Sequence, residues 1–362
     1  MSAIDDTIAC IGQLDAAAMV AARERQGTLT KPPGSLGRLE ELAVWLAGVT
    51  GAAIPRPLRR RAVIVLAADH GVTAQGVSAY PSAVTAQMVR NFAAGGAAIN
   101  ALAPTVGARV VVADFGVAAD LDDVPGLRRR SVAHGTADMA RGPAMSRVQA
   151  VQAVEAGIAL VDEEAAGGLD IVCTGEMGIG NTTAAAAITA TITGAAPDAV
   201  TGRGTGADDA RLAHKIQVVR QALAVNRPDA TDGLDVLAKV GGFELGGLAG
   251  VILGAASRRI AIVLDGYIAG AAALVAATLC PAVRPFLVAG HRSAESGHAV
   301  ALTHLGLAPL LDLSLRLGEG TGAVLALPIL DAAVAAHAAM ATFAGAGVSG
   351  ADIAASQVEH AR

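Results

Sequence analysis

The sequence predicts an α/β protein with a Rossmann-like, mostly parallel sheet flanked by helices. Five short apolar runs are rich in valine, isoleucine and leucine, and each leads into a polar loop that contains glycine. Unbroken apolar runs are typical of strands buried on both faces of a parallel sheet. Alanine-rich stretches separate the runs and can supply the crossover helices. The expected strands are residues 62–66, 109–112, 171–173, 260–264 and 285–288.

Both ends of the chain are expected to be helical. After the turn at residues 31–34, apolar residues recur at helical spacing, with Ser35 as the candidate N-cap. These positions are Leu36, Leu39, Leu42, Leu46 and Val49. From about residue 324 the sequence is again rich in alanine. The length of the chain suggests about two domains, or one large α/β unit with an extension.

Composition excludes several classes of protein. Of 362 residues, 53% are hydrophobic, 16% are charged and 2% are aromatic, which excludes a disordered or highly charged chain. The net charge of −5 and the scarcity of aromatic rings argue against nucleic acid as a partner. Two short arginine clusters, 59–61 and 128–130, are interpreted as solvated ends of elements. Three cysteines without CxxC spacing, and an N-terminus without a signal-like run, predict a cytoplasmic location.

A mean hydropathy of +0.51 raises the question of a membrane. Residues 177–197 and 266–283 carry no charge. Both lack the dense leucine, isoleucine and phenylalanine content and the aromatic belts of a strong span. We therefore expect buried helices and no membrane span, and a membrane transporter is a hypothesis that rests on hydropathy alone.

In an open parallel sheet, ligands bind at the carboxyl ends of the strands, where this sequence places its polar residues. Residues 174–183 follow one expected strand and precede an alanine-rich helix. Their glycines let the backbone come close to a ligand, and their N–H groups and threonine hydroxyls can hold an anion. A tight strand–helix turn explains the same residues equally well. The loop is not a Walker A motif, because no lysine follows its glycine.

Two further glycine loops carry charged residues. The loop at 202–206, with Lys215 on the following helix, suits phosphate, although a flexible surface turn is the simpler interpretation of that loop alone. Glu319 lies in the glycine-rich loop 317–322. Its carboxylate could have a raised pKa and act as a general base, or it could simply favour the start of a helix.

Two other loops give weaker signals. Residues 290–298 hold two histidines and a glutamate, but their spacing matches no common zinc pattern, so we expect polar contacts and no metal. Residues 71–81 and 84–89 mix apolar and polar side chains as a small organic ligand requires, or form an ordinary βα loop. The acidic pair typical of ribose-pyrophosphate binding is missing, so a Mg²⁺-diphosphate mechanism is not supported.

Seven motifs, spread in order over nearly the whole chain, resemble one family. They are Lys31-Pro-Pro-Gly-Ser-Leu-Gly37, Ala68-Asp-His-Gly-Val72, Gly175-Glu-Met-Gly-Ile-Gly-Asn-Thr-Thr183, Gly241-Gly-Phe-Glu244, Leu264-Asp-Gly-Tyr267, Ser293-Ala-Glu295 and Arg316-Leu-Gly-Glu-Gly-Thr-Gly322. Together they resemble the nicotinate-nucleotide–dimethylbenzimidazole phosphoribosyltransferases, which activate the lower-ligand base of cobalamin. The third and seventh motifs are highly specific in combination.

The resemblance implies an organisation and a reaction. It implies a homodimer, with a small helical domain from residues 1–60 plus 330–362 and a large α/β catalytic domain from residues 61–329. The implied reaction transfers the phosphoribosyl group of nicotinate mononucleotide to 5,6-dimethylbenzimidazole, with inversion at C1′ and without a cofactor or metal. A non-catalytic relative that binds a nucleotide or base, and the same transfer to a different base, are the alternatives.

The resemblance also assigns roles to residues. Glu319 is the general base that takes the benzimidazole proton, and Glu176 lies near the base and the ribose. The nucleotide, chiefly its phosphate, is held by Gly178, Gly180, Asn181, Thr182, Thr183, Gly202, Arg203, Gly204 and Lys215. The ribose and nicotinate side is completed by Asp265, Ser293, Gly318, Gly320, Thr321 and Gly322. The benzimidazole pocket is lined by Tyr80, Gln87 and Met88.

Overall fold

The computed structural model describes residues 2–204 and 206–350. Within them the chain forms two compact units, which are described separately below. The larger unit contains the described residues within 1–13 and 58–327, and the smaller unit those within 14–57 and 328–362. Thr205 of the expected phosphate loop and residues 351–362 of the expected C-terminal helical segment lie outside the described residues.

The larger unit is built on a six-stranded sheet in which every neighbouring pair of strands is parallel. The strand order β3-β2-β1-β4-β5-β6 is that of a Rossmann-like doubly wound sheet. The order reverses between β1 and β4, which places a ligand crevice outside the carboxyl ends of these strands. The strands are β1 (Arg61–Ala68), β2 (Ala108–Gly116), β3 (Arg128–Arg129), β4 (Ile171–Met177), β5 (Ala261–Leu264) and β6 (Leu287–Ala289).

The five predicted strands are all present, and the predicted α/β fold class is confirmed. Their apolar runs are buried because helices cover the sheet, as continuous hydrophobic runs require. The last strand begins at Leu287 rather than at Pro285, because Pro281–Phe286 form the 3₁₀ helix η3. Proline has no N–H to donate to a strand ladder, which explains the later start.

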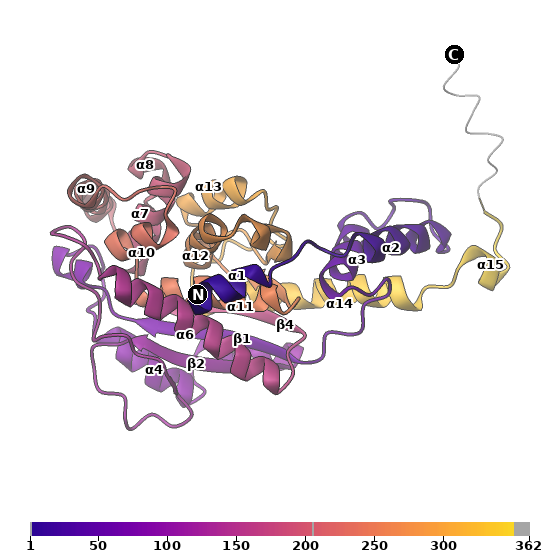
Figure 1. The fold of residues 1–362 in the computed structure, drawn as a ribbon, viewed down its shortest axis with the longest axis horizontal. Helices are drawn as coiled ribbons and strands as arrows, with labels where there is room; N and C mark the ends of the chain where they lie inside the picture. Colours follow the sequence, from indigo (N-terminus) through magenta and orange to yellow (C-terminus); the bar gives the residue numbers. More distant parts are fainter. Residues whose placement is uncertain (1, 205, 351–362) are drawn as a thin grey trace, which may run out of the picture. The chain divides into compact units, whose positions relative to one another are not determined.

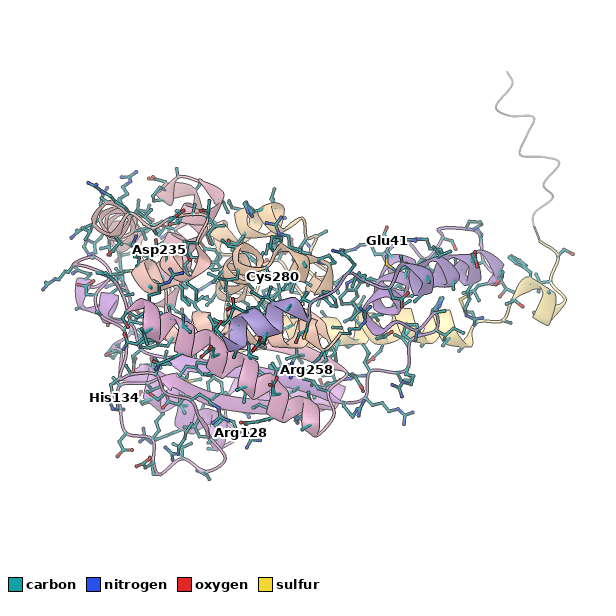
Figure 2. The ribbon with its side chains drawn as sticks, in the orientation of Figure 1. Glu41, Arg128, His134, Asp235, Arg258 and Cys280 are labelled. Carbon is teal, nitrogen blue, oxygen red and sulfur yellow. The ribbon has the colours of Figure 1, made fainter. Side chains whose placement is uncertain are left out.

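The edge strand β3 was not predicted. It consists of 2 exposed arginines and has no apolar pattern to reveal it. Both arginines are exposed, as expected of a solvated end, and Arg128, labelled in Figure 2, also reaches the buried Glu164 at 3.2 Å. Arg109 approaches the same carboxylate at 2.8 Å. A short, charged edge strand also protects the sheet from pairing with another chain.

Helices pack against the sheet and connect its strands. Both α4 (Val84–Ala93) and α11 (Phe243–Ser257) contact β1 and β2, and Figure 1 shows α4 below these strands and α11 above them. Further helical segments of this unit are α5 (Ala98–Leu102), α7 (Asn181–Thr193), α8 (Pro197–Val200), α9 (Asp209–Asn226), α10 (Gly233–Val240), α12 (Tyr267–Leu279), α13 (Ser296–Leu305), η1 (Gly71–Gln75) and η2 (Ala103–Val106).

The N-terminal helix α1 (Ala3–Ala9) belongs to the larger unit, although residues 1–60 were expected in the small helical domain. It packs against α6 (Arg147–Ala166) and α11, and Ile4 is buried there. Packing of this short apolar face, rather than position along the chain, decides which unit the helix joins. The unit boundaries therefore differ from the expected ones over residues 1–13, and slightly at residues 58–60 and 328–329.

Helices α6 and α11 approach each other closely through glycines. A Cβ atom on Gly157 of α6 would overlap the carbonyl oxygen of Gly247, and one on Gly250 would overlap the carbonyl oxygen of Val154. Neither backbone can move away cheaply in a close-packed interior. Small residues at these positions let the crossover helices pack backbone to backbone.

The uncharged segments that raised the membrane question form α7 and α12, each of 13 residues and largely buried. A helix needs about 20 apolar residues to span a bilayer. Among the described residues, one helix, α14 (Thr321–Ala339), is long and apolar enough by length and composition, and 50% of its most apolar window is buried within the protein.

The smaller unit contains α2 (Ala16–Thr28), α3 (Arg38–Thr50), the later part of α14 and α15 (Phe343–Ala346). Small apolar residues of α2 and α3 pack together. The predicted N-cap Ser35 is wrong, because α3 begins at Arg38 after Gly37, whose φ is +52°. Glu40 accounts for the difference, since its carboxylate accepts the backbone N–H of Leu36 at 2.9 Å and pairs with Lys31 at 2.7 Å.

Candidate active site

A cavity of about 510 Å³ lies in the larger unit among the loops that follow β4, β5 and β6. Side chains that are more than two hundred positions apart in the sequence share its wall, because the carboxyl ends of parallel strands meet at one edge of the sheet. Ten of the predicted residues line it: Tyr80, Met88, Glu176, Gly178, Asn181, Thr182, Gly204, Ser293, Gly318 and Glu319.

Glu319 is held in the cavity wall by an unusual backbone. Its φ is +63°, between Gly318 at +90° and Gly320 at +89°. A residue other than glycine in this left-handed region stores strain, which concentrates at functional sites. The carboxylate is 5% exposed and accepts the backbone N–H of Ile99 at 3.2 Å. Burial raises the pKa of Glu319, and this side-chain environment suits a proton acceptor.

The carbonyl of Glu319 lies directly against strand β4. A Cβ on Gly175 would be 2.7 Å from this carbonyl oxygen, so only glycine fits there. The next residue of β4 is Glu176, and a Cβ on Gly318 would overlap its carboxylate. Both carboxylates are therefore brought to the same wall by glycines that permit close approach.

Glu176 lies near the end of strand β4 and is 6% exposed. Asn181 donates its side-chain N–H to Glu176 Oε2 at 2.5 Å. Burial and the negative charge of Asp265 raise the pKa of Glu176 to about 8, although the hydrogen bond from Asn181 opposes this shift. Its surroundings therefore favour the protonated form of the Glu176 carboxyl at neutral pH.

A cationic corner lies at the start of α7. Lys215 is 1% exposed, and its Nζ donates to Thr182 Oγ1 at 2.7 Å and to the carbonyl of Gly202 at 3.3 Å. Burial lowers the pKa of Lys215 to about 8, and the nearby Glu295 opposes this shift. The buried Thr183 hydroxyl has no hydrogen-bond partner among the described residues. A lysine, threonine hydroxyls and a helix N-terminus favour the anion-binding interpretation over a simple turn.

The other predicted residues lie outside the cavity wall. Gln87 and Arg203 are exposed, and Arg203 pairs with Asp209 at 2.5 Å. On α4, Val84 and Met88 face the cavity one turn apart, and Gln87 projects from a different side of the helix. The remaining predicted residues are buried and are not among those that line the cavity: Gly180, Thr183, Gly202, Lys215, Asp265, Gly320, Thr321 and Gly322.

Asp265 lies beneath the Glu319 loop. Its Oδ2 accepts the N–H of Gly320 at 3.1 Å, and its Oδ1 accepts those of Gly322 at 2.7 Å and Ala323 at 3.1 Å. Burial raises the pKa of Asp265, while the nearby His291 and the three backbone N–H groups favour the charged carboxylate.

Several residues of the cavity wall were not assigned a role from the sequence. Glu295 is 6% exposed, accepts the N–H of Gly204 at 2.9 Å through Oε1, and has no partner for Oε2 among the described residues. Glu295 is part of the sixth family motif, and this membership is the sequence feature that could have identified it as a site residue. The others are Val84, Met177, Ile179, Gly266, Tyr267, Ile268, His291, Arg316 and Leu317.

Two of the seven motifs meet beneath the cavity floor. Nε2 of His70 lies 2.7 Å from Oε1 of Glu244, and both side chains are buried. The His70 ring also lies under the turn at Gly178, where a Cβ would be 3.4 Å from Cδ2. This pair supports the glycine turn from below. Within residues 2–204 and 206–350, no group of three or more metal-ligating side chains is placed to hold a metal ion.

Comparison with known proteins gives consistent matches. A phosphoribosyltransferase family model matches residues 11–348. The nicotinate-nucleotide–dimethylbenzimidazole phosphoribosyltransferase of Roseiflexus sp. is 62% identical over 350 residues, which are 97% of this chain and 99% of that protein. The enzyme of the same name from Chloroflexus aggregans is 60% identical over 349 residues, 96% of this chain and 99% of that one. A crystal structure of such an enzyme from Thermus thermophilus has a TM-score of 0.89 and 49% identity, covering 93% of this chain and 100% of that chain.

The doubly wound sheet and its acidic, glycine-walled cavity define an α/β enzyme with a small-molecule site at the carboxyl edge of the sheet. The matches narrow this class. The chain belongs to the phosphoribosyltransferase family, and the resemblance seen in its sequence motifs is confirmed. Like its relatives, it is a pentosyltransferase.

Proposed function

We propose that the protein transfers the phosphoribosyl group of nicotinate mononucleotide to 5,6-dimethylbenzimidazole, giving α-ribazole 5′-phosphate and nicotinate. The relatives that match nearly the whole chain carry this activity in their names. The observation that carries the proposal is the buried carboxylate of Glu319, which is held in the cavity wall by a strained, glycine-flanked turn.

In this reaction, one benzimidazole nitrogen attacks C1′ of the ribose while the bond from C1′ to the pyridinium nitrogen breaks. The bonding electrons go to nicotinate, whose ring nitrogen leaves neutral and needs no general acid. The other benzimidazole nitrogen loses its proton to Glu319, so that the product is neutral at the base. Attack opposite the leaving group inverts C1′ from β to α. The raised pKa of Glu319 makes its carboxylate a better proton acceptor.

The remaining groups bind the nucleotide. In this proposal the phosphate binds beside Lys215, Thr182 and the N-terminus of α7, because positive charge and hydroxyl donors are available there. The bound nucleotide already carries a positive pyridinium ring on C1′, and this charge near Glu176 favours the ionised form of that carboxyl. The ionised carboxylate then stabilises the oxocarbenium-like transition state electrostatically.

The proposal includes a homodimer in the cytoplasm. Leu317, at the cavity wall, is 58% exposed, and Leu313, four residues earlier, is 55% exposed. Exposed large apolar side chains are surface of the kind that a second copy can cover. Light scattering of the purified protein tests this part, and a monomeric mass at working concentration would contradict it.

The activity is tested by incubating the purified protein with both substrates and following nicotinate by chromatography. We expect nicotinate release that depends on the added base. Release with an azole, purine or phenol but not with dimethylbenzimidazole would revise the base. Tight nucleotide binding without release with any of these bases would favour a non-catalytic binding protein.

A further inference from the structure

Asp265 follows strand β5, is 1% exposed, and is not part of the cavity wall. Both of its carboxylate oxygens are occupied by backbone N–H groups. Oδ1 accepts from Gly322 at 2.7 Å and from Ala323 at 3.1 Å, and Oδ2 accepts from Gly320 at 3.1 Å. A carboxylate used in this way has little capacity left for a hydroxyl of a substrate.

The three donors lie at the start of α14, where backbone N–H groups have no partner within the helix. Gly320 directly follows Glu319, so the bond to Oδ2 fixes the end of the strained turn that carries the carboxylate. Charge-assisted bonds to an anionic acceptor are stronger than neutral ones, and the helix dipole adds to them. Asp265 thus supplies the interaction that offsets the strain of the left-handed backbone at Glu319.

The side chain of His291 also lies beside the Asp265 carboxylate. Its Nε2 is 3.6 Å from Asp265 Oδ1, and its ring lies so close to Gly322 that a Cβ there would overlap it. The imidazole and the first turn of α14 therefore confine the Asp265 carboxylate from two directions. The carboxylate cannot turn toward the cavity without breaking its bonds to the loop.

We propose that Asp265 is a positioning residue, which holds the Glu319 carboxylate where it accepts the proton of the incoming base and does not itself contact substrate. This inference rests on the proposed function, because it takes Glu319 as the base. It replaces the expectation that Asp265 belongs to the ribose and nicotinate side of the site.

The test is a double-mutant cycle of Asp265→Asn and Glu319→Gln. The side-chain amide of D265N has only one acceptor oxygen, so its NH₂ group would face at least one backbone N–H. Two donors that face each other repel, and we expect the Glu319 turn to shift. A displacement of about 1 Å can cost about 10²-fold in rate. We expect kcat of the single D265N variant to fall by about this factor, with the KM values of both substrates nearly unchanged. In the E319Q background, D265N should cause no further loss.

Val263→Ala is the matched control. Val263 is a fully buried residue of the same strand, so the variant loses stability without removing the carboxylate. We expect a lower melting temperature and an unchanged kcat. If D265N does not fold, D265S keeps one helix-capping oxygen and completes the same cycle.

Two outcomes would overturn the inference: a raised KM for the nucleotide with an unchanged kcat, or an equal loss in both backgrounds. Hydrogen exchange distinguishes these outcomes from failure of the proposed function, because it does not depend on the activity. Amides of residues 320–323 should exchange faster in D265N than in V263A, whatever the activity. Equal exchange in the two variants would also overturn the inference.

Discussion

Glu319 is buried, has a strained backbone and is the proposed general base. Replacing it with glutamine keeps the size of the side chain and removes the proton acceptor. We expect kcat to fall about 10²–10⁴-fold, which is the usual contribution of a general base. Steady-state nicotinate release measures this. Glu163→Gln on the exposed face of α6 is the control, and a Glu319→Gln variant with the kcat of this control would remove the assigned role.

Glu176 makes stability depend on pH. Burial raises its pKa from the ordinary value of 4.5 to about 8 in the folded protein. Between these values the folded protein holds a proton that the unfolded chain has released, so the free energy of unfolding falls as the pH rises. Glu176→Gln mimics the protonated form. We therefore expect its melting temperature, relative to that of the original protein, to rise between pH 5 and pH 8.5. A difference that does not change with pH would contradict this.

Lys215 gives nucleotide binding a pH dependence of its own. Because burial lowers its pKa to about 8, the ammonium group loses its proton as the pH rises through this value. Affinity for the phosphate should then fall between pH 7 and pH 9.5. Lys215→Met keeps the aliphatic stem, binds more weakly at pH 7, and should lack this decline. Titration calorimetry of nicotinate mononucleotide measures both. The same decline in Lys215→Met would assign it to another group.

At the scale of elements, the contact between α6 and α11 depends on glycine. Gly157→Ala places a methyl group on the carbonyl of Gly247, so the helices must separate. We expect a loss of about 1–3 kcal/mol in the free energy of unfolding, which denaturant titration measures. Gly27→Ala in α2 has nothing within 4 Å of the new methyl group and should be neutral or slightly stabilising. Equal effects of the two variants would contradict this account.

The elements themselves were largely predictable, whereas the directions of single side chains were not. Continuous apolar runs identify the five longer strands because burial on both faces imposes that pattern. The two arginines of β3 carry no such pattern. Gln87 and Asp265 lie in the expected segments, but their surroundings could not be predicted: Gln87 is exposed, and Asp265 accepts backbone N–H groups at the start of α14. Those outcomes depend on contacts between distant loops, which local sequence does not encode.

For the molecule as a whole, the high mean hydropathy reflects apolar helices that are almost completely buried. Every residue of α11 from Phe243 to Ala256 is buried, and so is every residue of α12 from Tyr267 to Ala277. We expect the purified protein to stay in the supernatant after high-speed centrifugation without detergent. Co-sedimentation with lipid vesicles would contradict this, and would point to α14 as the element to examine.

The strand order has a consequence for how the protein is made. The central strand β1 pairs with β2 soon after it in the chain, but its other neighbour is β4, with Arg61 opposite Ile171. Helix α1 likewise cannot pack against α11 until α11 has been synthesised, and one edge of the sheet is complete only after β6 has been made. Contacts of this long range make folding slow and leave apolar strands unpaired while synthesis continues. Most of the chain must therefore be synthesised before the larger unit can complete its sheet. A product truncated before β6 would lack part of that sheet, and we expect it not to fold.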